Sequence, residues 1–388
     1  MQDRLLFPRI SNSSKSILLL GPRQVGKSTL IKALRPQKLI NLADEQNLLL
    51  YSKDPGLLKK ELTALKSPSL IALDEVQRVP KLLNDVQAIC DDFEIKHRFL
   101  LTGSSARKLR HGGANLLPGR IIQEFMDPLS YLEIKNDFDL ERCLQIGMLP
   151  GIYFDRNEGQ EVLETYVEVY LREEIRAEGL ARDIGAYARF LDVVAMISGQ
   201  WLNYSKLSSD TEIAKETIRR YLSVLEDTLL IFRVPSFQPV SNISRRVSQR
   251  DKIFLFDVGV RNAILGLHKG KLSKDQVGPI FEQWVVLQVI YLNRALRKGW
   301  KIFSYLSAGG AEVDCVIQTQ AEIYGIEIKS GRNVTWRQSK GLNSLAEIVG
   351  KKWPYRKIIV YTGQIVQKLQ DGTEILPVET FLERLSQT

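Results

Sequence analysis

A short apolar segment followed by a glycine-rich loop constrains the fold of this chain more than any other feature. Residues 16–20 (SILLL) have the composition of a buried strand, and GPRQVGKST leads from them into the apolar helical segment LIKAL. Gly21 and Gly26 let the backbone curl, so that its N–H groups can converge on phosphates. The helix that follows adds the positive end of its dipole. A strand, a loop of this spacing and a helix predict a nucleotide-binding α/β domain.

Each part of the loop has an expected role. We expect the backbone to surround the phosphates, Lys27 to reach the β- and γ-phosphates, and the Ser28 hydroxyl to ligate Mg²⁺. ATP and Mg²⁺ are therefore the expected cofactors. The predicted nucleotide-binding residues of the loop are Gly21, Pro22, Arg23, Gln24, Val25, Gly26, Lys27, Ser28 and Thr29.

Two further apolar segments end in polar residues that suit the same site. SLIALDEVQ predicts a strand ending in Asp74, which can hold the Mg²⁺ shell, and Glu75, which can orient or deprotonate the attacking water. HRFLLTGSS predicts another strand, with Ser104 or Thr102 placed to sense the γ-phosphate. A simple strand-to-loop turn is the alternative for this second segment.

One arginine is a candidate for stabilising the transition state. Arg120 in LPGRI can act in its own chain or from a neighbouring subunit, which would require a homo-oligomer. A structural salt bridge is equally compatible with the sequence.

Several of these segments carry a resemblance to a known family. GPRQVGKST, LDEVQRVP, LLTGSS and LPGRI…PLSYLE resemble a group of bacterial and archaeal AAA+-type ATPases whose C-terminal half is a domain of unknown function. The resemblance implies an ATPase core over about residues 1–135, and it continues in the segments RYLSVLEDTLLI and KIFLFDVGVRNAI.

The middle of the chain predicts a helical connector and a winged helix. Residues 159–197 repeat apolar side chains at three- and four-residue steps. Residues 201–227 contain two short helical patterns, and apolar strands follow at 229–237 and 252–257, an order typical of a winged helix. Packing or protein contact is the alternative use of such a module. The candidate contacts with DNA phosphates come from its second helix and its loop: Lys215, Arg219, Arg220, Arg245 and Arg246.

Two apolar strands near the end of the chain carry charges on alternate residues. GGAEVDCVIQTQAEIYGIEIKSG places Asp314 on the first strand and Glu327 and Lys329 on the second. A helix expected at 279–296 carries Glu282 in its first turn. With further strands and a helix, the order becomes α-β-β-β-α-β, which is the core order of the PD-(D/E)XK nuclease superfamily.

That resemblance implies metal-dependent cleavage of DNA. Glu282, Asp314 and Glu327 are the expected ligands of Mg²⁺, with Mn²⁺ as a substitute, because such ions prefer carboxylate oxygens. Lys329 is the expected catalytic residue that positions or helps deprotonate water. The alternative is that Glu327 and Lys329 pair with neighbours on an open face of the sheet.

Charge and hydropathy agree with these expectations. The formal net charge of +9 favours an anionic partner such as DNA, with a generally basic surface as the alternative. No apolar run approaches the roughly 18 residues of a membrane span, and MQDRLLFPRI does not have the features of a secretory signal. We therefore expect a cytoplasmic protein without a membrane partner.

Together the patterns predict an α/β multidomain protein. Its expected parts are a P-loop AAA+-type ATPase domain (1–145), a helical connector with a winged helix (146–270) and a PD-(D/E)XK nuclease-like α/β domain (271–388). We expect ATP hydrolysis that gates DNA binding and cleavage. Two alternatives remain: a non-cleaving ATP-dependent DNA-binding switch, and an ATP-driven protein-interaction module.

Overall fold

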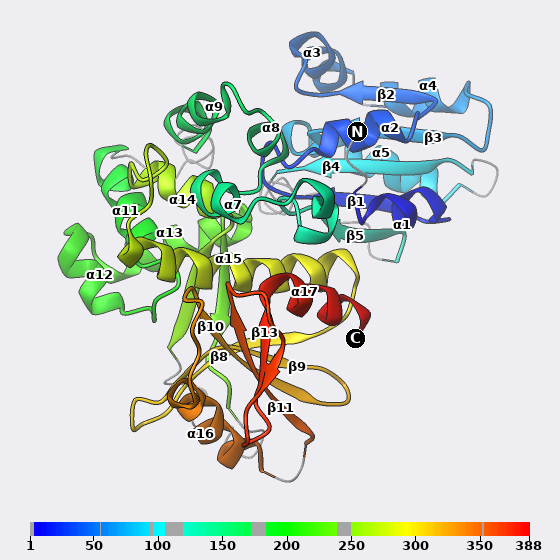
Figure 1. Cartoon of the computed structure of the whole chain (residues 1–388). Coiled ribbons are helices and arrows are strands. Elements are labelled where there is room, and N and C mark those ends of the chain that lie inside the picture. Colours follow the sequence, from blue (N-terminus) through cyan, green and yellow to red (C-terminus); the bar gives the residue numbers. More distant parts are fainter. Residues whose placement is uncertain are drawn as a thin grey trace. The chain divides into compact units, whose positions relative to one another are not determined.

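The chain divides into two compact units. Unit 1 contains residues 1–128 with 223–230, and unit 2 contains 129–222 with 231–388. The predicted division into three domains is finer than this and stays a prediction. The computed structural model describes residues 4–54, 56–92, 96–104, 119–171, 184–238, 250–350 and 353–388 (Figure 1).

Unit 1 is built on a parallel sheet of five strands. Their order is β2-β3-β4-β1-β5, and every neighbouring pair is parallel. All five carboxyl ends therefore lie at one edge, which is where α/β sheets bind ligands. This parallel α/β core confirms the fold class predicted for the N-terminal part. The strands are β1 (Ser16–Leu20), β2 (Lys38–Asn41), β3 (Leu70–Asp74), β4 (Arg98–Gly103) and β5 (Ile121–Phe125).

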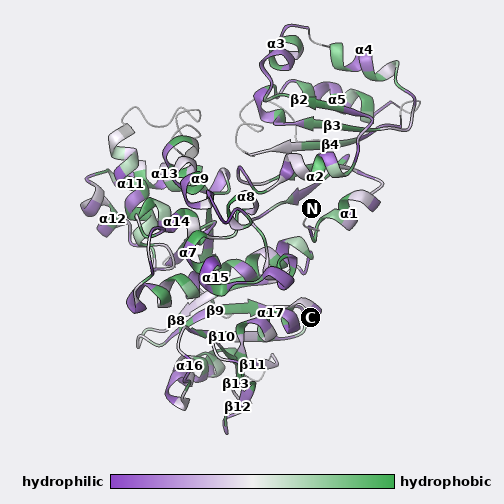
Figure 2. Cartoon of the chain, turned by 45° about the horizontal axis from the view of Figure 1, so that its top comes forward, coloured by the Kyte–Doolittle hydropathy of each residue, from purple (hydrophilic) through white to green (hydrophobic). Residues whose placement is uncertain are grey.

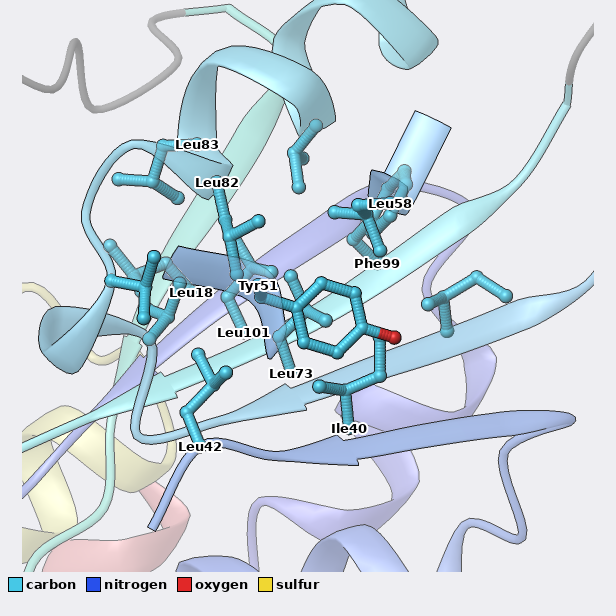
Figure 3. Close-up of a cluster of buried hydrophobic side chains, with 14 of the residues drawn as sticks. Leu18, Ile40, Leu42, Tyr51, Leu58, Leu73, Leu82, Leu83, Phe99 and Leu101 are labelled. Carbon is cyan, nitrogen blue, oxygen red and sulfur yellow. The ribbon is translucent and has the colours of Figure 1, made fainter. Parts of the chain in front are cut away.

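The core of unit 1 lies on one face of this sheet. Side chains alternate along a strand, so Leu18, Leu73 and Leu101 point to the same side, where they meet Leu58 and Leu82 from the helices (Figure 3). Burying one such side chain contributes about 1.5–3 kcal/mol. The helices of this unit are α1 (Phe7–Asn12), α2 (Lys27–Ala33), α3 (Glu45–Lys53), α4 (Leu57–Thr63) and α5 (Leu82–Cys90), with a 3₁₀ turn at Val76–Arg78.

A buried carboxylate joins the helices at the start of unit 2. Asp257 Oδ2 accepts a hydrogen bond from Met148 N at 2.7 Å, and Oδ1 accepts one from Val260 N at 3.0 Å. A Cβ on Gly259 would lie 1.9 Å from Ile146 O, so only glycine allows this close approach. The elements are α7 (Leu140–Ile146), α8 (Pro150–Tyr153), α9 (Gly159–Thr165), a π-helical turn (Tyr166–Leu171), α11 (Ile184–Met196) and α14 (Val258–Ile264).

Two helices and a strand pair follow in the order predicted for a winged helix. They are α12 (Tyr204–Thr211), α13 (Lys215–Asp227), β6 (Ile231–Pro235) and β7 (Asp251–Leu255), and the two strands are antiparallel. Asn203 begins α12 with a side chain that accepts hydrogen bonds from two backbone N–H groups, as N-cap residues do. The element order agrees with the prediction, while the winged-helix identity itself stays a prediction.

The C-terminal part of unit 2 is a mixed sheet with helices on both faces. Its strand order is β12-β13-β11-β10-β9-β8. Helices α15 and α17 lie on one side and α16 on the other (Figure 1). The predicted α-β-β-β-α-β order is present. The elements are α15 (Lys274–Ala295), β8 (Lys301–Leu306), β9 (Glu312–Gln318), β10 (Ile323–Lys329), α16 (Lys340–Val349), β11 (Tyr355–Tyr361), β12 (Gln367–Lys368), β13 (Glu374–Pro377) and α17 (Val378–Gln387).

The apolar residues of α16 explain its packing. Leu342, Leu345 and Val349 are buried against the sheet at three- and four-residue steps. This spacing is that of an amphipathic helix. The exposed residues of the helix are mostly hydrophilic, apart from Ile348 (Figure 2). Along the described ranges, no helix is both long and apolar enough to cross a membrane.

Candidate nucleotide and metal sites

The glycine-rich loop follows β1 at the carboxyl edge of the sheet in unit 1. Gly26 has φ +97°, and Gln24 has φ +63°, so the loop needs left-handed backbone at two positions. A Cβ on Gly21 would lie 2.2 Å from Met126 O. Lys27 is 5% exposed, and its Nζ donates to Gly21 O at 2.8 Å and to Pro22 O at 2.7 Å. The lysine therefore lies within the loop, as the nucleotide prediction requires.

The other predicted loop residues take different positions. Val25 is fully buried and contributes its backbone, and Arg23 is half-buried. Ser28 and Thr29 are exposed in the first turn of α2. Arg4, which sequence analysis passed over, donates to Val25 O at 2.6 Å and to Asp127 O at 2.7 Å. Arg4 thus ties the loop to the chain beyond β5.

Three oxygen-bearing side chains meet beside the loop. Ser28 Oγ donates to Asp74 Oδ2 at 2.6 Å, and Thr102 Oγ1 donates to Asp74 Oδ1. Ser28 and Asp74, the two side chains predicted to hold Mg²⁺, are therefore in direct contact. Oxygen ligands of this kind suit Mg²⁺, which neutralises phosphate charge when bound.

Glu75 is connected to the end of β4 through a residue that sequence analysis missed. Gln77 Nε2 donates to Glu75 Oε2 at 2.5 Å and to Ser104 Oγ at 3.1 Å, and Glu75 N donates to Thr102 Oγ1 at 3.2 Å. Glu75 itself has φ +61°, a conformation that non-glycine residues rarely adopt. The predicted water-activating carboxylate and both sensor candidates thus belong to one hydrogen-bonded group. The segment DEVQ contains Gln77, but nothing in its local pattern marks it.

Arg120 lies at the amino ends of the strands, opposite the carboxyl ends that carry the glycine-rich loop. It directly precedes β5, whose Ile121 pairs with Ser16 at the amino end of β1. Its Nε donates to Asp91 Oδ1 at 2.5 Å and its Nη2 to Asp91 Oδ2 at 2.9 Å. The five residues of β1 span about 16 Å at about 3.3 Å each. The salt bridge with Asp91 is the structural alternative left open by the sequence, and the catalytic role of Arg120, in its own chain or from a neighbouring subunit, stays a prediction.

The predicted residues of the C-terminal site come from one helix and two adjacent strands. Asp314 on β9 is 8% exposed, and its Oδ2 accepts a hydrogen bond from Ile328 N at 2.8 Å. On β10, Lys329 Nζ donates to Glu327 Oε1 at 2.6 Å. Glu282 lies in the third turn of α15, because the helix begins at Lys274 and not at Pro279 as predicted.

The start of α15 is a correction with a clear physical cause. Ser273 and Gln276 form a capping box that satisfies the first N–H groups of the helix. Pro279 lies inside the helix and removes one backbone donor, but the capped turn before it is retained. Pro279 therefore lies in the second turn of α15 and not at its first position, where the sequence pattern had placed it.

A lysine from β7 completes this group. Lys252 is 2% exposed, and its Nζ lies 3.0 Å from Glu282 Oε1 and 2.7 Å from Glu312 Oε1. Trp201 Nε1 donates to the same Glu312 oxygen at 3.0 Å. Sequence analysis missed Lys252 because it follows a run of surface-like basic residues. Its position next to Asp251 at the start of an apolar strand is the signal in the sequence.

Burial and mutual repulsion shift the carboxylates of this group. Burial, followed by the charge of Asp314, raises the pKa of Glu282 to about 7. The same two causes raise the pKa of Glu327 to about 7, against the opposing effect of Lys329. Burial also raises the pKa of Asp314. Carboxyl groups in this state bind protons near neutral pH unless a cation offsets their charge.

The donor chemistry of this group fits a divalent cation. Glu327 Oε2 is buried and has no hydrogen-bond partner, which is costly for a carboxylate oxygen and would be relieved by Mg²⁺ or Mn²⁺. Among the residues described, no set of three or more His, Cys, Asp or Glu side chains is gathered closely enough to hold a metal as it stands. The metal role of Glu282, Asp314 and Glu327 therefore stays a prediction.

The predicted DNA contacts lie in part on α13. Lys215, Arg219 and Arg220 are exposed. The Arg219 guanidinium lies 5.2 Å from the centre of the Tyr204 ring, and that of Arg220 lies 5.8 Å from the centre of Tyr221. The other two predicted contacts, Arg245 and Arg246, lie outside the described residues.

Comparison with known proteins shows three family matches along the chain. Residues 13–135 match the AAA domain, residues 137–271 match a domain of unknown function (DUF8612), and residues 277–381 match another domain of unknown function (DUF4143). These matches agree with the AAA-type part of the resemblance. They leave the winged-helix and nuclease-like parts as predictions.

Curated relatives are similar along nearly the whole chain. An uncharacterized protein of Mycobacterium tuberculosis is 26% identical over 94% of this chain and 80% of its own length. An uncharacterized protein of Methanocaldococcus jannaschii is 24% identical over 91% of this chain and 84% of its own length. The solved structure of a STAND-type ATPase of Pyrococcus horikoshii with a tetratricopeptide repeat sensor is 13% identical, and the match covers 74% of this chain and 44% of that one with a TM-score of 0.25. The match over residues 13–135 supports an AAA-type ATPase, and with it the binding and hydrolysis of ATP.

Proposed function

We propose that this protein is a Mg²⁺-dependent ATPase that binds DNA and cleaves it at its C-terminal acidic site. The observation that supports the cleavage is the placement of Asp314 and Glu327 on the adjacent strands β9 and β10, where burial and the charge of Asp314 raise the pKa of Glu327 and of Glu282 on α15, and where Lys329 contacts Glu327. Carboxylates on two adjacent strands, with a lysine beside them, suit the hydrolysis of a phosphodiester.

The ATPase half rests on the phosphate loop and its neighbours. Lys27 lies within the loop to meet phosphate oxygens, and Ser28 and Asp74 lie in contact to hold Mg²⁺. Glu75 orients the water that attacks the γ-phosphorus, so that the bond to the β,γ-bridging oxygen breaks and ADP leaves. Gln77 fixes the position of this carboxylate.

At the C-terminal site, the chain supplies ligands and orients water. Asp314 and Glu327 provide the oxygens for the divalent ion, which activates water and neutralises charge on the scissile phosphate when it is bound. Lys329 Nζ, 2.6 Å from Glu327 Oε1, lies where it can position that water. Attack of the water on phosphorus breaks one P–O bond and leaves a phosphate monoester and a hydroxyl end.

The test is cleavage of plasmid and single-stranded DNA with Mg²⁺ or Mn²⁺. Lys329→Ala should lower the rate by about 100-fold or more, the range for loss of a proton-handling group. Lys368→Ala, on exposed strand β12 of the same sheet, is the matched control and should cleave at the wild-type rate. Equal cleavage by wild type and Lys329→Ala would show that the nuclease assignment is wrong.

One observation favours a second function. Lys252 forms ion pairs with Glu282 and Glu312, and Lys329 forms one with Glu327. Such pairs can hold an acidic cluster together without a metal. In that case the protein would be an ATP-dependent DNA-binding switch that does not cleave. DNA binding by the wild type without cleavage under any metal condition would support this second function.

A further inference from the structure

The position of Lys252 limits what the C-terminal site can bind. Its ammonium contacts one carboxylate of α15, Glu282, and one of β9, Glu312. Hydrolytic sites with two metals hold the ions about 3.5–4 Å apart and share carboxylates between them. Here a fixed cation of the protein already lies between two of the four carboxylates.

Three contacts hold this lysine in place. Lys252 pairs with Val234 in the β6–β7 ladder and forms a bridge with Trp201. Its Nζ lies 5.4 Å from the centre of the Trp201 ring. Trp201 Nε1 in turn donates to the Glu312 oxygen that Lys252 contacts. Because the Lys252 side chain is 3% exposed, displacement of its ammonium from these carboxylates would leave a buried charge without partners, which is strongly unfavourable.

The charges of the group lead to the same conclusion. Glu282, Glu312, Asp314 and Glu327 face Lys252 and Lys329. Four carboxylates and two ammonium groups leave a formal charge of −2 when all six are ionised. One divalent cation offsets this charge, and a second would leave an uncompensated positive charge in a buried site.

We propose that Lys252 takes the place of a second metal ion, so that the C-terminal site holds one divalent cation, on Asp314 and Glu327. This inference rests on the proposed nuclease function and deepens it. Lys252 is a positioning residue in this account, because it acts through Glu282 and Glu312. Its removal should free those two carboxylates and admit a second ion.

The test is the number of Mn²⁺ ions that the full chain binds, measured by calorimetry. All proteins carry Asp74→Asn, which removes the carboxylate beside the phosphate loop. The parent should bind one ion per chain, and Lys252→Met should bind two. Lys252→Arg keeps the charge and should bind one. Lys357→Met is the matched control, because Lys357 on β11 of the same sheet forms an ion pair with Asp371, in the turn before β13, and it should also bind one.

Each result has a defined meaning. Two ions in the parent, or one ion in both the parent and Lys252→Met, would overturn the role of Lys252 while leaving the nuclease proposal intact. No bound ion in any protein would overturn the nuclease proposal itself. If Lys252→Met does not fold, Lys252→Gln takes its place, because its neutral amide also removes the positive charge that keeps out the second ion, and it should bind two ions.

Discussion

At the scale of single residues, the two sites differ in how they treat charge. Lys27 Nζ donates to the carbonyl oxygens of Gly21 and Pro22. Lys329 and Lys252 contact carboxylates instead. The loop contacts of Lys27 are therefore with neutral groups, while the C-terminal lysines lie in a group of carboxylates.

The raised pKa values predict how the metal-free protein responds to pH. Glu282 and Glu327 ionise near 4.5 when unfolded and at about 7 when folded. Between these values the folded state binds more protons, so the free energy of unfolding falls as pH rises from about 4.5 to about 7. Urea unfolding in EDTA should therefore show greater stability of the C-terminal part at pH 5.5 than at pH 8.

Two comparisons check the cause of this pH effect. Glu327→Gln should show a smaller loss of stability between pH 5.5 and pH 8, because the amide does not ionise. Mn²⁺ at pH 8 should restore stability to the wild type. A wild-type protein whose metal-free stability rises over this pH range would contradict the assigned shifts.

At the scale of elements, the sequence predicted local features well and distant contacts poorly. The loop GPRQVGKST is contiguous, so its spacing alone predicts that Lys27 and Ser28 lie at the junction of the loop and the helix that follows it. The alternation on β9 and β10 likewise placed Asp314 and Glu327. Lys252 could not be predicted, because its partners lie 30 and 60 residues away and come together only through the fold of unit 2.

The packing of α14 on α7 gives a prediction at this scale. Ala at position 259 would bring Cβ to 1.9 Å from Ile146 O, which forces the helices apart and disturbs the hydrogen bonds of Asp257. Gly259→Ala should lower the free energy of unfolding by about 1–3 kcal/mol, the usual cost of overpacking. Chemical denaturation measures the change.

A second glycine provides the control for this packing prediction. A Cβ on Gly151, in α8, would meet no atom within 4 Å. Gly151→Ala should therefore leave stability unchanged or raise it by about 0.5–1 kcal/mol, since alanine loses less entropy in a helix. Equal effects of the two substitutions would show that the contact at Gly259 is not the cause.

At the scale of the whole molecule, the two candidate sites lie in different units. The phosphate loop belongs to unit 1 and the acidic group to unit 2. Each site has its own lysine, Lys27 in one and Lys329 in the other, so one lysine can be substituted without changing the other site. The hypothesis that ATP gates DNA cleavage rests on the presence of both sites in one chain.

The most direct test measures ATP hydrolysis and DNA cleavage side by side in wild type, Lys27→Ala and Lys329→Ala, with and without ATP. We predict that Lys329→Ala hydrolyses ATP at the wild-type rate but does not cleave DNA. Lys27→Ala should lose ATP hydrolysis by about 100-fold or more, as expected when a charge-stabilising donor is removed, and should also lose ATP-stimulated cleavage. If wild type hydrolyses ATP and no protein cleaves DNA with Mg²⁺ or Mn²⁺, the account of the C-terminal site is contradicted.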